Sequence, residues 1–235
     1  MNQNISFQQT GAMAKVNAFI RSTYNWMTLG LAATGMTSYF VSNSPAVLQV
    51  VFGNPLMPWV LFIGLILMCG FLGARIQKMQ ASTATGLYVA LTVLYGICLA
   101  PIFLVYTKAS IASTFFICAA TFGAASVYGM VTKKDLTGMG QFLMMGLFGI
   151  IIAMVINIFI GSSAMQTIIS MIAVVIFTGL TAYDTQKLKS MAVTMPDNAT
   201  GAMVRKGAIM GALSLYLDFM GLFVHLLSLL GVARD

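Results

Sequence analysis

Seven apolar stretches of membrane-crossing length follow one another along the chain and leave little sequence for anything else. A transmembrane helix needs about 20 predominantly apolar residues to cross the hydrocarbon core of a bilayer. The stretches that meet this requirement span about residues 23–42, 56–74, 86–106, 110–131, 139–160, 164–184 and 208–231. We therefore predict an all-α integral membrane protein in which residues 23–235 form one domain of seven transmembrane helices.

The composition excludes an ordinary soluble protein. Hydrophobic residues make up 59% of the chain and charged residues only 7%, whereas about a quarter of the residues of a soluble domain are charged. The formal net charge is +7, but the lysines and arginines flank the apolar stretches and form no long basic run. Retention of basic loops in the cytoplasm explains this excess better than nucleic-acid binding does. We expect the lipid bilayer as a partner and no nucleic acid.

The placement of lysine and arginine also predicts the orientation of the chain. Segment 1–22 and every second connection after it carry ten basic residues, whereas the opposite connections and the carboxyl terminus carry two. Because basic residues are enriched on the cytoplasmic side, we expect a multi-pass protein with a cytoplasmic segment at 1–22 and the carboxyl terminus outside. The two longest connections are predicted at 43–55 and 185–207.

The last apolar stretch carries a polar seam on one helical face. The seam residues recur at alternating steps of four and three, which is helical spacing. They are Gly207, Gly211, Ser214, Asp218, Gly221, His225 and Ser228. An ionisable group at the centre of a membrane helix costs at least about 2.5–3.5 kcal/mol. We therefore predict that this helix is buried and central, with its seam facing other helices or a cavity.

Two of the five aspartates fall within apolar stretches. Asp135, Asp197 and Asp235 are expected to be solvated, whereas Asp184 ends the sixth stretch and Asp218 lies inside the seventh. Two carboxyl groups that are close in a low dielectric cannot both ionise cheaply, so they share a proton over some range of pH. If these two meet, they form a pH sensor.

The same two carboxylates suit weak binding of Ca²⁺. This ion takes six to eight oxygen ligands, of which Asp184 and Asp218 supply at most four, and weak binding suits passage more than storage. We expect no tightly bound cofactor, and Ca²⁺ and protons as permeant or regulatory ions. Arg75, at the cytoplasmic end of the second helix, is either a partner of one carboxylate in a closed state or an ordinary basic flank beside Lys78.

The predicted helix ends set the two aspartates at different depths. A last helix that begins near residue 208 places Asp218 about 15 Å from the surface, whereas Asp184 would lie at the surface. The pair can meet only if the last helix starts lower relative to the membrane surface, or if the sixth helix is tilted or short. Otherwise Asp184 contacts water or Lys187, and Asp218 is a hydrogen-bonded packing residue.

Two motifs carry a family resemblance. Residues 183–186 read Tyr-Asp-Thr-Gln, and residues 212–219 read Ala-Leu-Ser-Leu-Tyr-Leu-Asp-Phe. Further agreement occurs at residues 73–76, 126–129 and 132–136. From about residue 20 to its end, the chain resembles the Bax inhibitor-1 family, also called the transmembrane Bax inhibitor motif proteins.

This resemblance implies a seven-helix fold in which the last helix is surrounded by the other six. It also implies a pH-sensitive Ca²⁺ leak channel in which Asp184 and Asp218 pair near the cytoplasmic mouth and interact with Arg75. The short amino-terminal segment is similar to bacterial members, which favours the cell inner membrane. The connection predicted at 185–207 is longer than in many relatives, and without a charged carboxyl-terminal tail we expect no gating by such a tail.

Two other functions stay open. A non-conducting regulator would bind membrane proteases or other membrane proteins and use the aspartates only for folding. A presenilin-type intramembrane aspartyl protease also pairs aspartates on its sixth and seventh helices. In those proteases Gly-x-Gly precedes the second aspartate, whereas residues 215–217 here read Leu-Tyr-Leu, so we expect no enzyme. We interpret His225, two turns beyond Asp218, as a contact with a neighbouring helix rather than a proton relay.

Overall fold

The computed structural model describes the backbone of residues 2–196 and 198–234, and side chains from Lys15 onward. Nine helices and no strand longer than an isolated bridge occur in this part of the chain. The helices are α1 (Asn2–Ser42), α2 (Pro45–Phe52), α3 (Met57–Arg75), α4 (Ala81–Leu99), α5 (Ile102–Val105), α6 (Lys108–Val131), α7 (Thr137–Ile160), α8 (Ser163–Val193) and α9 (Gly201–Leu230). The prediction of an all-α protein is therefore confirmed.

Six helical segments of the described chain are long and apolar enough to cross a membrane. They are α3, α4 together with α5, α6, α7, α8 and α9. The first predicted crossing, 23–42, lies in α1, which runs without a break through the boundary predicted at residue 22. Threonine, serine and asparagine side chains make this stretch less apolar than the other six. Seven crossings and a central last helix therefore stay predictions.

The long connection predicted at 185–207 is wrong. The α8 helix continues to Val193 and α9 begins at Gly201, so both helices extend past their apolar stretches. The extension of α8 is amphipathic, because Leu188 and Ala192 are buried one turn apart while Lys187 and Lys189 are exposed. The hydropathy pattern predicts only where the apolar stretch ends, at residue 184, whereas the helix itself ends nine residues later, at Val193. The connection predicted at 43–55 also contains a helix, α2.

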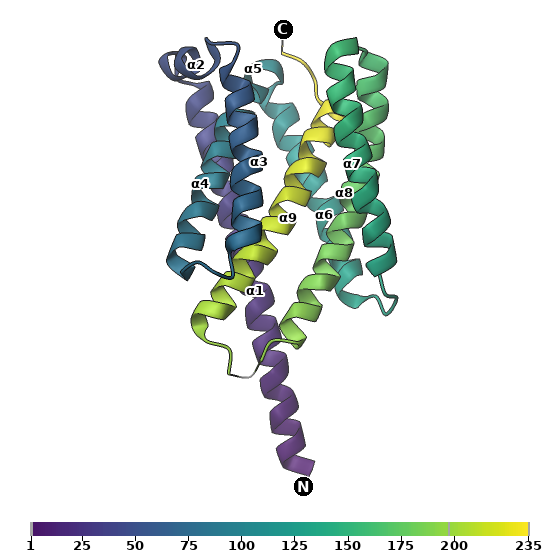
Figure 1. Cartoon of the computed structure of the whole chain (residues 1–235). Helices are drawn as coiled ribbons and strands as arrows, with labels where there is room; N and C mark the ends of the chain where they lie inside the picture. Colours follow the sequence, from purple (N-terminus) through teal and green to yellow (C-terminus); the bar gives the residue numbers. More distant parts are fainter. Residues whose placement is uncertain (1, 197, 235) are drawn as a thin grey trace. The chain divides into compact units, whose positions relative to one another are not determined.

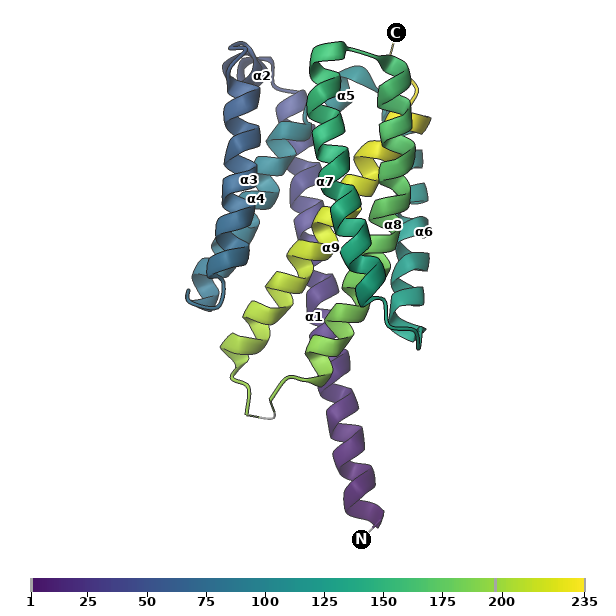
Figure 2. The same cartoon turned by 45° about the vertical axis from the view of Figure 1, so that its right-hand side comes forward.

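The chain divides into two compact units, the first made of Met1–Val105 and Ser190–Leu213. In this unit α4 packs against both α1 and α3 (Figures 1 and 2). The Tyr88 hydroxyl donates to the Trp26 carbonyl at 3.0 Å, and the Thr34 hydroxyl donates to the Thr92 carbonyl at 2.8 Å. A β-carbon at Gly96 would lie 2.7 Å from the Thr34 carbonyl oxygen. The polar groups of α1 are thus bonded to α4 at close range.

The first half of α9 also belongs to the first unit. The Lys206 ammonium donates to the Gln77 carbonyl at 2.8 Å, just beyond the end of α3. The Arg205 guanidinium carbon lies 5.6 Å from the centre of the Trp26 ring, a cation–π distance. A β-carbon at Gly207 would lie 3.1 Å from the Phe19 ring. These contacts anchor the start of α9 on α1 and on the α3–α4 connection.

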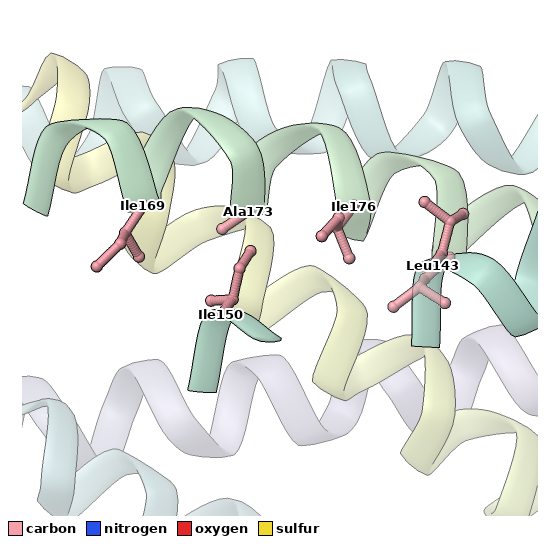
Figure 3. Close-up of a cluster of buried hydrophobic side chains, with 6 residues drawn as sticks. Leu143, Ile150, Ile169, Ala173 and Ile176 are labelled. Carbon is pink, nitrogen blue, oxygen red and sulfur yellow. The ribbon is translucent and has the colours of Figure 1, made fainter. Parts of the chain in front are cut away.

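The second unit consists of Tyr106–Lys189 and Ser214–Asp235. Its α7 and α8 helices share an apolar cluster, in which Ile150 points toward Ile169 and Ala173 (Figure 3). The α6 helix packs on α9, where the Cys118 thiol donates to the Phe219 carbonyl at 3.6 Å. The residues after α9 return to the start of α6, where Tyr106 and Ala233 form an isolated β-bridge. These packed faces position the helices that carry the two aspartates.

Candidate ion site on helices α8 and α9

The two membrane aspartates both lie within helices of the second unit. Asp184 is nine residues before the end of α8 at Val193, and Asp218 is seventeen residues after the start of α9 at Gly201. The carboxyl groups of the two residues interact electrostatically. Asp184 lies farther from the end of its helix than predicted because α8 continues to Val193, and Asp218 lies farther from the start of its helix because α9 begins at Gly201.

Asp218 is buried without a hydrogen-bond partner for one of its oxygens. Its side chain is 5% exposed, and its Oδ2 atom has no partner in the described part of the chain. The hydroxyl groups of Thr185 and Ser126, in the same unit, are also buried and unpartnered. Buried polar groups in native proteins nearly always have a partner, which can be a water molecule or an ion. These three groups therefore call for water or another polar partner in the folded protein.

The residues around Asp184 tie α8 to the α6–α7 connection. The side-chain amide of Gln186 accepts a hydrogen bond from the Leu136 N–H at 2.9 Å and donates one to the Lys134 carbonyl at 2.8 Å. The Lys189 ammonium donates to the Met130 carbonyl in the last turn of α6 at 2.7 Å. These bonds hold the turn of α8 that carries Asp184. The motif at residues 183–186 contains Gln186 but does not predict this role for its side chain.

Lys187 is the basic residue that interacts electrostatically with Asp184. Asp184 is also partly exposed, whereas Asp218 is buried and has Asp184 as its charged neighbour. The two carboxyl groups therefore have different surroundings. A charged neighbour of Asp184 is Lys187, whereas the charged neighbour of Asp218 is the Asp184 carboxyl group.

Asp135 and Arg75 are both exposed and lie outside the aspartate pair. Asp135 is exposed, as predicted, whereas Asp197 and Asp235 lie outside the described residues. The Thr137 hydroxyl and backbone N–H both donate to Asp135, and these hydrogen bonds lower the pKa of its carboxyl group. Arg75 is exposed in the last turn of α3, in the first unit. Its action on the aspartate pair stays a prediction.

His225 joins a buried polar cluster between α8 and α9. Its Nδ1 atom lies 3.3 Å from the Ser170 hydroxyl, which in turn donates to the Ser228 hydroxyl at 3.3 Å. The predicted contact with a neighbouring helix is confirmed, and that helix is α8. Among the described residues, no group of three or more histidine, cysteine or acidic side chains is placed to hold a metal ion.

The apolar helices, the buried aspartate and the polar cluster define a multi-pass helical membrane protein. The family model described as "Inhibitor of apoptosis-promoting Bax1" matches residues 16–235, so the chain belongs to the Bax inhibitor-1 family. The resemblance inferred from the motifs at 183–186 and 212–219 is confirmed.

Similar proteins occur in several bacteria. The chain is 42% identical over 221 residues to "Inner membrane protein YbhL" of Escherichia coli strain K12, covering 94% of each chain. It is 37% identical over 219 residues to an uncharacterised protein of Borreliella burgdorferi, covering 93% of this chain and 94% of that one. An uncharacterised protein of Deinococcus radiodurans is 36% identical over 233 residues, covering 99% of this chain and 98% of that one. The similarity thus extends over nearly the whole chain.

Proposed function

We propose that this protein is a pH-sensitive cation leak channel for Ca²⁺ in the inner membrane, in which a proton shared by Asp184 and Asp218 controls passage. One observation carries the proposal. Asp218 is buried in a membrane helix with an unpartnered carboxylate oxygen, and the charged group that acts on it is a second carboxyl group. Ionisable residues inside a membrane protein usually mark ion or proton pathways.

Such a pair of carboxyl groups can be stabilised in two ways, by a shared proton or by a bound cation. With one proton bound, the carboxyl groups of Asp184 and Asp218 can share a hydrogen bond and carry one charge between them. Without that proton, two like charges in a low dielectric repel each other and need a cation. Protonation and cation binding therefore compete with each other, and this competition is the physical basis of the proposed pH control.

Calcium fits as a transient, partly hydrated ion. The two carboxyl groups offer at most four oxygens, and the unpartnered hydroxyl groups of Thr185 and Ser126 are further oxygen atoms in the same unit. Because Ca²⁺ prefers six to eight oxygen ligands, water must supply the remainder. An incomplete set of ligands favours release, which conduction requires.

The proposed topology has seven crossings, with α1 as the first. Its hydrogen bonds to the middle of α4, from Thr34 to the Thr92 carbonyl and from Tyr88 to the Trp26 carbonyl, support this topology. In hydrocarbon, hydrogen bonding between helices compensates for polar side chains. With basic residues retained inside, the amino terminus is cytoplasmic and the carboxyl terminus is outside. The inner-membrane location is supported by the similarity to YbhL.

The test is Ca²⁺ flux into liposomes that contain the purified protein, measured from mildly acidic to neutral pH. We expect flux that changes with pH in the unaltered protein and falls in Asp218→Asn, with the pH dependence lost in both Asp218→Asn and Asp184→Asn. Asp135→Asn is the matched control, because that aspartate is exposed in a connection, and it should behave as the unaltered protein does.

Other outcomes would overturn the proposal. Absence of flux in the folded, unaltered protein would favour the non-conducting regulator. Cleavage of a helical reporter that is lost in both Asp184→Ala and Asp218→Ala would favour the protease.

A further inference from the structure

An aromatic ring lies on the polar seam of α9 between Asp218 and His225. The Phe177 ring of α8 occupies the space that a β-carbon at Gly221 would need. The same ring stacks on His225, with ring centres 6.0 Å apart and planes at 24°. Gly221 lies three residues after Asp218 and four before His225, on the same helical face. The ring therefore separates the aspartate pair from the histidine cluster.

The face of α8 that lies against α9 shows the same order of polar, aromatic and polar residues. Ser170, Phe177 and Asp184 are seven residues apart, about two helical turns, and so share one face of α8. Ser170 contacts His225 and Ser228, Phe177 contacts Gly221 and His225, and Asp184 interacts with Asp218. The two helices thus meet at three successive levels, of which the outer two are polar and the middle one is aromatic.

We propose that Phe177 is the hydrophobic barrier of the ion path, closing the α8–α9 seam between the aspartate pair and a second polar station formed by Ser170, His225 and Ser228. The inference rests on the proposed function and adds a barrier residue and a second station to it. The hydroxyl oxygens of Ser170 and Ser228 at this station are the kind of ligand that can replace water around Ca²⁺. Apolar constrictions block ions by excluding that water.

The seam positions on either side of the ring are partly exposed. Ser214 and Ser228, seven residues to either side of Gly221, have intermediate exposure, as has Gly221 itself. The Phe177 ring, rather than a difference in exposure, therefore marks the level of the proposed barrier. The ring also contacts the apolar cluster shared by α7 and α8, which holds it in place.

Thiol labelling tests the barrier without relying on flux. The background lacks Cys69, Cys98 and Cys118, and Ser228→Cys is the reporter. The probe is a membrane-impermeant methanethiosulfonate, applied from one side of sealed vesicles and then from the other. We expect labelling from one side only while Phe177 is present, and from both sides in Phe177→Ala. Val175→Ala on the exposed face of α8 is the control, because that side chain is 68% exposed.

A second variant displaces the ring without removing it. Gly221→Ala places a methyl group where the Phe177 ring lies, so we expect two-sided labelling and a several-fold rise in Ca²⁺ flux. Adding Gly221→Ala to Phe177→Ala should change neither the labelling nor the Ca²⁺ flux further, because no ring is left to displace. Thermal melting of each variant in detergent verifies that the protein is folded.

The two proposals fail in different ways. One-sided labelling in folded Phe177→Ala and Gly221→Ala overturns the barrier, even if flux depends on Asp218. Absence of flux from every variant, with labelling that still becomes two-sided, overturns the channel and leaves Phe177 as the seal of the seam.

Discussion

The ring of Tyr183 lies against Gly140 of α7, so closely that a β-carbon at position 140 would come within 2.5 Å of the ring carbons. Tyr183 is the residue immediately before Asp184. The place of the Asp184 backbone therefore depends on a glycine in another helix. Small residues allow membrane helices to approach closely in this way.

Gly140→Ala should destabilise the protein by about 1–3 kcal/mol, because the Tyr183 ring must move to admit the new methyl group. Gly149→Ala in the same helix is the control, since a β-carbon there meets no atom within 4 Å. That substitution should be neutral or stabilise the helix by up to about 1 kcal/mol. Unfolding in detergent measures both, and equal stabilities of the two variants would contradict the contact.

Gln186→Ala should loosen the α6–α7 connection, because two hydrogen bonds between the Gln186 amide and the backbone are lost, one accepted from the Leu136 N–H and one donated to the Lys134 carbonyl. Each bond contributes about 0.5–1.5 kcal/mol. Gln186→Glu keeps an acceptor for the Leu136 N–H but loses the donor to the Lys134 carbonyl, so its effect should be intermediate. Hydrogen exchange at the Leu136 amide should quicken most in Gln186→Ala. Unchanged exchange in that variant would contradict the bond to Leu136.

Asp135 should make the stability of the protein depend on acid pH. Its pKa is lowered in the folded protein, first by the Thr137 hydroxyl and then by the Thr137 N–H. The stabilisation is therefore complete above the unfolded pKa of about 3.9, and is lost as pH falls through the lower folded pKa. The melting temperature of Asp135→Ala should lie below that of the unaltered protein at pH 6. The gap should narrow below about pH 4, and a gap that widens there would contradict the sign.

A carboxyl-terminal fusion decides between six and seven crossings. With α1 as the first crossing, the two termini lie on opposite sides of the membrane. Alkaline phosphatase fused after the last residue should be active, because it folds outside the cytoplasm, whereas green fluorescent protein fused there should stay dark. Fluorescence from that fusion, with inactive phosphatase, would favour an even number of crossings.

Much of the fold follows from apolar length alone. Six of the predicted stretches correspond to segments long and apolar enough to cross a membrane. The burial of Asp218 was predicted from the small and polar seam of its helix, and the structure confirms it. The end of α8 and the start of α9 were not predictable from hydropathy, because the amphipathic turns around Leu188 extend α8 past its apolar stretch and α9 begins at Gly201, before its own apolar stretch.

The details of the site depend on which helices meet, and the sequence does not contain that information locally. Gln186 bonds to backbone groups some 50 residues away, so no periodicity reveals the contact. Phe177 has the spacing of an ordinary apolar helix residue, and only the pairing of α8 with α9 sets its ring beside Gly221. The lack of a Cβ at that seam position was the single indication that another side chain approaches.

The most direct test of the shared proton is infrared difference spectroscopy of the reconstituted protein across pH, with Ca²⁺ flux measured on the same liposomes. We expect a band from a protonated carboxyl group that disappears at the pH where flux changes, and that is absent or shifted in both Asp184→Asn and Asp218→Asn. A band that does not change over the pH range in which flux changes, or that persists unaltered in both variants, would contradict control by this pair.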